Sequence, residues 1–162
     1  MPAVQTIEIS DFIKKFRDLI RNNAALTAFA TEKYGKAPFI YVGIDIKAPP
    51  TESTMPNIVI SPADPSKMEG ADQKACFYYV TIDWAISDGS VSSDTNMHEA
   101  LGVYASDKFG QLIWESINNF SSNCPASKVD FTVEGMAFAP IFPGAMTVEI
   151  EVPVVMGATI TI

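Results

Sequence analysis

The chain has 162 residues, a formal net charge of −8 and a hydrophobic fraction of 48%. This length and apolar content fit one folded domain, residues 1–162, and are not typical of disordered proteins. Its apolar runs are far shorter than the ~18 residues that a membrane-spanning helix needs. The first ten residues also lack the basic start and apolar centre of a secretory signal. We therefore expect a protein that folds in a cytoplasm and has no membrane partner.

The charge is unevenly distributed along the chain. Residues 1–36 contain six bases and four acids, whereas the remaining 126 residues contain five bases and fifteen acids. Nucleic-acid binding needs clustered Lys and Arg, so an acidic body of this kind argues against specific DNA or RNA recognition. Two interpretations of the basic first segment stay open: an ordinary solvated helix face, or a surface that meets an acidic patch on a neighbouring copy.

Two helices are predicted near the N-terminus. The first has Ser10 as a plausible N-cap, with Asp11 favouring the positive end of the helix dipole. Its apolar residues recur at helical spacing, and its bases lie on the other face. The apolar positions are Phe12, Ile13, Phe16, Leu19 and Ile20, and the bases are Lys14, Lys15, Arg17 and Arg21. The second helix spans 24–34 and ends at Gly35, a natural C-cap.

Three strands follow, at 39–44, 57–60 and 77–87. The third is the clearest, because apolar residues alternate over its whole length with polar ones such as Thr81 and Asp83. The apolar set is Tyr78, Val80, Ile82, Trp84 and Ile86. Residues 47–56, with three prolines, and the polar residues 66–74 are predicted to be loops, the latter mobile.

One long helix is predicted over 95–120, capped by Asp94 or Thr95, with His98 and Glu99 in its first turn. Its expected apolar stripe has Phe109 beside it. The stripe consists of Leu101, Tyr104, Ala105, Leu112, Ile113, Ile117 and Phe120.

Two strands close the chain. Alternation from Val129 to Val133 and from Met146 to Val154 predicts them, and Pro143-Gly144 suggests the turn of this hairpin. Pro153 cannot donate a ladder hydrogen bond, so its end of the strand should lie at a sheet edge. The predicted fold is a single α+β domain with the order α-α-β-β-β-α-β-β. Its mainly antiparallel sheet packs against the long helix and the N-terminal helices.

The sequence offers little for catalysis. His98 is the only histidine, no glycine-rich phosphate loop follows a strand, and Cys76 and Cys124 lack partners at metal-ligand spacing. Glu149 and Glu151 point the same way along one strand. They could bind a cation or act on a sugar, but alternation with an apolar face explains them as the solvent side. We predict no catalytic residue, no cofactor, no metal site and two reduced thiols.

The order of segments resembles the tail terminator, or tail completion, proteins of long-tailed bacteriophages. Three stretches carry the resemblance: "AALTAFATEKYGKAPFIYV" after a first helix, "MPNIVISPADPS" leading into "CFYYVTIDWAIS", and "MHEALGVYASDKFGQLIWESINNF" followed by "MAFAPIFPGAMTVEIEVPVV". It spans roughly residues 10–156 and rests on pattern and order, without an invariant motif.

The resemblance implies a structural virion protein, assembled in the host cytoplasm and located in the tail. Such proteins form a ring, usually a hexamer, on the end of the tail tube. The ring stops tube polymerisation and provides the surface for head docking. Its partners are then the tail tube protein and a head-completion or neck protein, and DNA passes through the lumen without specific binding. As candidate subunit-interface residues we take Lys14, Lys15, Arg17, Arg21, Glu149 and Glu151.

Other functions stay open. The chain also resembles other phage neck, head-tail joining and minor tail proteins at this level. A small non-viral ligand-binding α+β domain would need a concave apolar pocket with converging polar groups. An enzyme would need a partner chain to complete its site. The mass of the protein in solution separates these functions from a ring.

Overall fold

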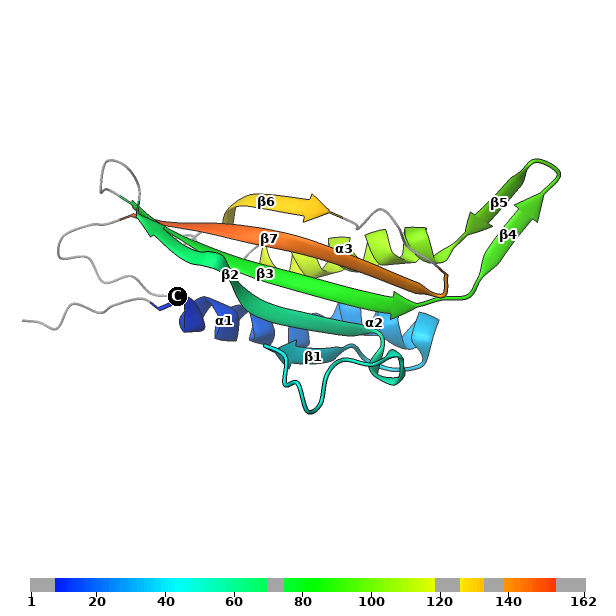
Figure 1. The fold of residues 1–162 in the computed structure, drawn as a ribbon, viewed down its shortest axis with the longest axis horizontal. Coiled ribbons are helices and arrows are strands. Elements are labelled where there is room, and N and C mark those ends of the chain that lie inside the picture. Colours follow the sequence, from blue (N-terminus) through cyan, green and yellow to red (C-terminus); the bar gives the residue numbers. More distant parts are fainter. Residues whose placement is uncertain (1–7, 70–74, 119–125, 133–138, 154–162) are drawn as a thin grey trace, which may run out of the picture.

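The computed structural model describes residues 8–69, 75–118, 126–132 and 139–153. These residues form three helices, a five-stranded sheet and a two-stranded hairpin that projects from one end of the molecule (Figure 1). The predicted α+β class is confirmed. In chain order the elements are α1 (Ile9–Arg21), α2 (Ala24–Tyr34), β1 (Phe39–Val42), the 3-10 turn η1 (Glu52–Thr54), β2 (Asn57–Glu69), β3 (Ala75–Ser87), β4 (Val91–Asp94), β5 (Met97–Ala100), α3 (Gly102–Ile117), β6 (Ala126–Thr132) and β7 (Ile141–Pro153).

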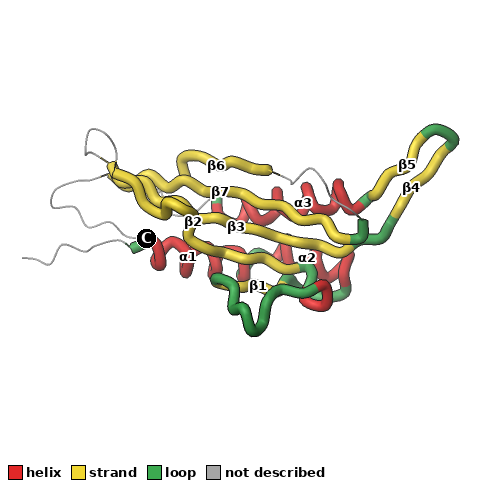
Figure 2. Tube along the Cα trace, in the orientation of Figure 1, coloured by secondary structure: helices red, strands yellow, loops and turns green. Residues whose placement is uncertain are grey.

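The strands of the large sheet lie in the order β1-β2-β3-β7-β6. β1 is parallel to β2 and the other neighbouring pairs are antiparallel, which confirms a mainly antiparallel sheet. All three helices lie on one side of this sheet, behind the strands in Figure 2. No helix of the described residues covers the other side, which we call the open face.

The two N-terminal helices form as predicted. α1 begins slightly before the expected cap, because Glu8 is the N-cap and its N–H donates to the Asp11 carboxylate at 3.0 Å. The side chain of Asn23 caps α2 by accepting from the Leu26 N–H at 3.0 Å. Gly35 ends α2 with φ of 74°, a left-handed conformation that suits glycine.

The alternation of β3 is confirmed. Tyr78, Val80, Ile82, Trp84 and Ile86 are all at most 5% exposed, while the residues between them are only half-buried. The buried side chains of β3 join those of β2, β7 and all three helices in one hydrophobic cluster. The same parity holds in β7, whose buried residues are Phe142, Met146, Val148, Ile150 and Val152. The core therefore fills the space between the sheet and the helical layer.

The prediction of one helix over 95–120 is wrong at its start. Residues Val91–Asp94 and Met97–Ala100 pair as antiparallel strands, and α3 begins only at Gly102. The Asp94 carboxylate accepts the Thr95 N–H at 2.6 Å, so this cap-like pair closes a hairpin turn instead of a helix. His98 and Glu99 consequently lie in β5, outside any helix.

The expected stripe of α3 also needs correction. Tyr104 is 60% exposed, because its hydroxyl donates to the Glu99 carboxylate of the hairpin at 2.9 Å instead of entering the core. Phe109, predicted to lie beside the stripe, is fully buried at its centre. Leu101 precedes the helix and is half-buried. The buried residues Ala105, Leu112, Ile113 and Ile117 confirm the rest, and Phe120 lies outside the described residues.

The second predicted strand is too short. β2 continues to Glu69 through an irregularity between Pro62 and Lys67, so residues 66–69 are strand and not a loop. Residues 70–74 lie outside the described residues. β2 pairs with β3 on both sides of this break, which contains Pro65, whereas Pro62 is itself paired with Val80.

The predicted turn at Pro143-Gly144 is also wrong, since both residues lie inside β7, opposite Ala85 and Trp84 of β3. Pro153 pairs with Ala75, beyond the last described pair of β6 with β7, Ala126 with Ile150. Its end of β7 therefore has a described partner on one side, as expected for a proline. β6 confirms the strand near Val129, and residues 136–138 lie outside the described residues.

Candidate functional site

The bases of α1 lie on the side of the helix away from the core. Lys14 and Arg21 are exposed, and Lys15 and Arg17 are half-exposed. The Arg17 guanidinium lies 2.8 Å from the Asp18 carboxylate, and this hydrogen bond is the main cause that lowers the pKa of Asp18. α1 packs against β1, β2, β3 and α3 on the helix side of the sheet.

Glu149 and Glu151 lie on the open face of β7, as the alternation predicted. The buried residues between them, Ile150 and Val152, face the helices. The sheet therefore separates the two predicted charge sets, and a bond between α1 and these carboxylates within one copy is excluded. In register, Lys128 of β6 is the partner of Glu149.

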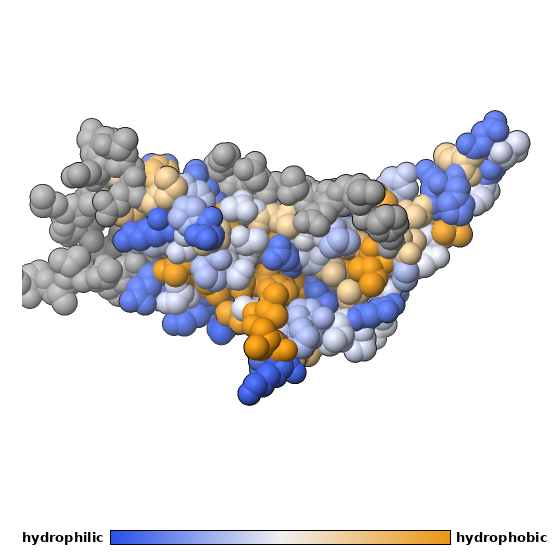
Figure 3. All heavy atoms as spheres, in the orientation of Figure 1, coloured by the Kyte–Doolittle hydropathy of each residue, from blue (hydrophilic) through white to orange (hydrophobic). Residues whose placement is uncertain are grey.

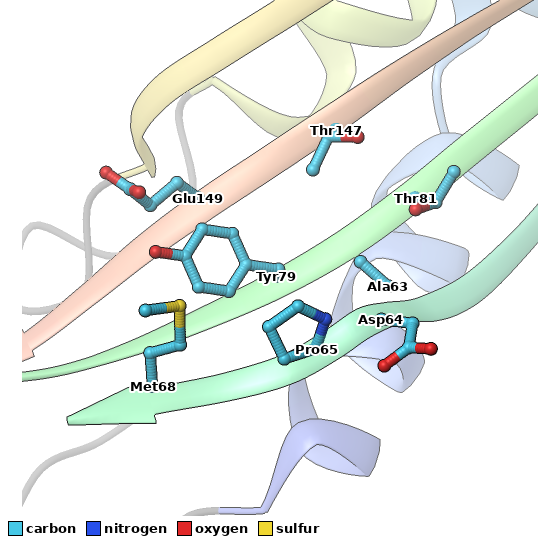
Figure 4. Close-up of a pocket in the computed structure, with 8 residues that line it drawn as sticks. All are labelled: Ala63, Asp64, Pro65, Met68, Tyr79, Thr81, Thr147 and Glu149. Atoms are coloured by element: carbon cyan, nitrogen blue, oxygen red, sulfur yellow. The ribbon is translucent and has the colours of Figure 1, made fainter.

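A shallow depression of about 450 Å³ lies on the open face (Figure 4). The Tyr79 ring occupies its middle, with Glu149 on one side and Pro65 and Met68 on the other. Partial burial, followed by a hydrogen bond to Glu149, raises the pKa of Tyr79, so the phenol is protonated at neutral pH. The full lining is Ala63, Asp64, Pro65, Met68, Tyr79, Thr81, Thr147 and Glu149. If the chain is instead a ligand-binding domain, this depression is where the ligand would bind.

His98 lies on the projecting hairpin. Its Nδ1 is 2.7 Å from the Ser93 hydroxyl, and the two residues are directly opposite each other in the β4–β5 register. Both side chains are exposed. A Ser–His catalytic pair also needs a group that orients the imidazole, and no described residue bonds its other nitrogen. Cross-strand pairing accounts for this contact.

Two further observations concern sites predicted to be absent. The described residues contain no group of three or more His, Cys, Asp or Glu side chains that could hold a metal ion. Among the helices that the structure describes, none is long and apolar enough to cross a membrane. Cys76 is a half-buried thiol, and Cys124 lies outside the described residues.

The hairpin itself is the surface that sequence reasoning missed. It projects beyond the end of the large sheet and exposes Val91 and Met97, which are 53% and 50% accessible (Figure 1). Two acids, Asp94 and Glu99, and no Lys or Arg lie in residues 89–101. The available signal was the polar turn Asp94-Thr95-Asn96 between Val91 and Met97.

A second apolar surface lies at β1 and the loop that follows it. Figure 3 shows hydrophobic side chains on a protrusion at the lower edge of the view, and the tip of this protrusion is hydrophilic. Phe39, Val42, Ile44 and Ile46 are between 53% and 89% exposed. Clustered apolar side chains at such exposure are typical of interaction sites.

Comparison with known proteins finds no protein-family model and no curated protein that matches this chain.

Proposed function

We propose that this chain is a structural virion protein that forms a ring on the end of a long-tailed phage's tail tube. The ring stops tube polymerisation and provides the surface to which the head docks. The proposal rests on the resemblance in segment order and on the surfaces of the subunit. It assigns the protein no reaction and no cofactor.

The observation that carries the proposal is the separation of surfaces around a rigid core. The acids with described side chains on the open face include Asp64, Glu149 and Glu151, whereas the bases of α1 lie behind the sheet. A ring needs two different complementary surfaces on each copy, because identical surfaces close into a dimer. A subunit whose ends and faces differ this much meets that requirement.

In this ring the open face lines the lumen. Acidic side chains there lack the cationic contacts that give DNA its non-specific affinity for proteins, so DNA passes without sticking. Glu149 and Glu151 then belong to the lumen. The bases Lys14, Lys15, Arg17 and Arg21, on the helix side of the sheet, lie at the seam between copies, where they face an acidic surface of the next subunit.

A polymerisation assay tests the proposed function. Tail tube protein from the same phage is polymerised with and without this protein, and tube length is measured by microscopy. We expect elongation to stop when the protein is added, with a plateau in tube length. Tubes that keep growing at the same rate with the protein in excess would contradict the proposal. The ligand-binding alternative predicts no effect on tubes and a particle that stays at 17.6 kDa.

A further inference from the structure

The β4–β5 hairpin is a separate two-stranded sheet among the described residues. In the described residues β4 pairs with β5 alone, so each strand has one edge without a partner. Two-stranded ribbons are marginally stable in water without further packing. This one nevertheless carries two half-exposed apolar side chains, Val91 and Met97, away from the core. A ribbon of this kind gains stability by docking.

The base of the hairpin is firmly held, which fixes its direction. The Asp88 N–H donates to the Pro140 carbonyl at 2.7 Å, and the Asp88 carboxylate accepts the Ser90 N–H at 2.9 Å. The second carboxylate oxygen of Asp88 lies 3.1 Å from the Lys33 ammonium of α2. The Leu101 N–H donates to Ser90 across the base at 2.9 Å. A contact made by a prearranged arm loses less conformational entropy than one made by a mobile loop.

The β1 edge is the matching surface. The Phe39 and Gly43 N–H groups donate to Pro56 and Ile60 beside β2, each at 2.9 Å. Because successive residues of a strand point their backbone groups in opposite directions, those of Ile40 and Val42 point to the free edge. No strand of the described residues lies on that side of β1. Such an edge accepts an added strand.

We propose that the β4–β5 hairpin of one copy adds to the β1 edge of a second copy. Within one copy the hairpin points away from β1, which lies at the opposite edge of the molecule (Figure 1). The charges also favour this pairing, since the hairpin has Asp94 and Glu99 without a Lys or Arg, whereas α1, which contacts β1, carries four bases against two acids, and Asp45 and Lys47 in the loop after β1 cancel each other. Met97 would cover the apolar surface of Val42, Ile44 and Ile46, because the β4–β5 register places it on the same face of the ribbon as Asp94 and Glu99 and places Val91 on the other face.

This inference deepens the proposed ring, because it names the contact between successive copies, but its test does not depend on tail tubes. Two proteins are made in a Cys76→Ser/Cys124→Ser background, one with Met97→Cys and the other with Ile44→Cys. We expect disulfide-linked dimers when the two are mixed under oxidation, and little cross-linking of either alone. The matched control replaces Ile44→Cys with Met68→Cys, another half-exposed apolar position, far along β2.

The outcomes separate the contact from the function. Cross-linking that is equally strong within Met97→Cys alone, or with Met68→Cys, would overturn the hairpin contact. Rings that form without the mixed cross-link would also overturn it and leave the proposed function standing. The mixed cross-link in open chains that never stop tube growth would support the contact and remove the proposed function. Absence of both rings and cross-links would overturn both.

A negative charge placed beside the edge provides a second test without cysteines. Ile44→Glu with Ile46→Glu, the edge variant, changes side chains that are already 60% and 89% exposed, so the subunit fold should survive. These two positions lie in the loop that follows β1, where added carboxylates would repel Asp94 and Glu99 of the docking hairpin. We expect assembled protein to shift to single subunits of 17.6 kDa, while Met68→Glu leaves assembly unchanged. Equal assembly by the edge variant and wild type, with intact thermal unfolding, would overturn the proposed contact.

Discussion

Trp84 lies directly against Gly144 across the β3–β7 pair. A Cβ built on Gly144 would come within 2.3 Å of the indole ring, so only glycine fits beneath this side chain. The indole is 2% exposed, and its Nε1 donates to the Ser106 hydroxyl of α3 at 3.1 Å. One residue pair therefore fixes both the spacing of two strands and the position of a helix on the sheet.

Gly144→Ala should destabilise the subunit. The added methyl forces the indole from its site, and overpacking of this kind costs about 1–3 kcal/mol in unfolding free energy. The matched control is Gly89→Ala, where nothing lies within 4 Å of the added Cβ and φ does not require glycine. Chemical denaturation of both variants measures the difference. Equal midpoints would show that the indole relaxes freely.

Asp88→Asn should loosen the base of the hairpin. Burial raises the pKa of Asp88, but hydrogen bonds from Ser90 and Lys33 outweigh it, so the net pKa lies below the ordinary range. A carboxyl with a lowered pKa stabilises the folded state above its ordinary pKa of about 3.9, and this contribution is lost as the pH falls through the folded value.

The melting temperature should therefore be higher for wild type than for Asp88→Asn at pH 7, and the two should converge below pH ~4. Asp107→Asn, an exposed carboxylate on α3, is the control and should show no such difference. A gap between wild type and Asp88→Asn that persists unchanged in acid would mean that the Asp88 charge does not hold the hairpin base.

Reversal of two bases on α1 should weaken assembly. Lys14→Glu with Arg17→Glu turns attraction at the seam into repulsion, and added salt should weaken the wild-type ring for the same reason. Single rim pairs contribute only about 0–1 kcal/mol, but a closed ring repeats each contact around its circumference. Lys108→Glu reverses an exposed base of α3 and serves as the control. Sedimentation at several salt concentrations should show a weakened ring only for the α1 variant. If this variant assembles as wild type does, with the same dependence on salt, the proposed charge attraction between subunits is wrong.

His98→Ala should leave tail-length control and infectivity intact, because Ser93 is the one hydrogen-bond partner of the imidazole among the described residues, and His98 lies in a hairpin whose proposed role is docking. The variant must still assemble for the comparison to be valid. Loss of activity in an assembled ring would indicate a chemical role for His98 and count against a purely structural protein.

The elements with a strong local signal were predictable from sequence. The alternation in β3 and the Gly35 cap of α2 are properties of a few neighbouring residues, and both form as expected. The sequence pattern also predicted that the α1 bases and Glu151 lie away from the core, as they do. Their placement on opposite sides of the sheet was not predictable, because it depends on the strand order.

The failures arise where distant contacts override local preference. Gly144 reads as a turn residue, yet its smallness serves Trp84, which is sixty positions earlier in the chain. Met97–Ala100 is compatible with a helix, but pairing with Val91–Asp94 makes it a strand. This hairpin became visible only in three dimensions, and it carries one side of the proposed interface.

Negative-stain microscopy of the purified protein, alone and mixed with preformed tail tubes, tests the central claim most directly. We predict closed rings of several subunits, each 17.6 kDa, and a single ring seated on one end of each tube. Bare tube ends and isolated single subunits, at concentrations where the tubes themselves are stable, would contradict the claim that this protein caps the tube.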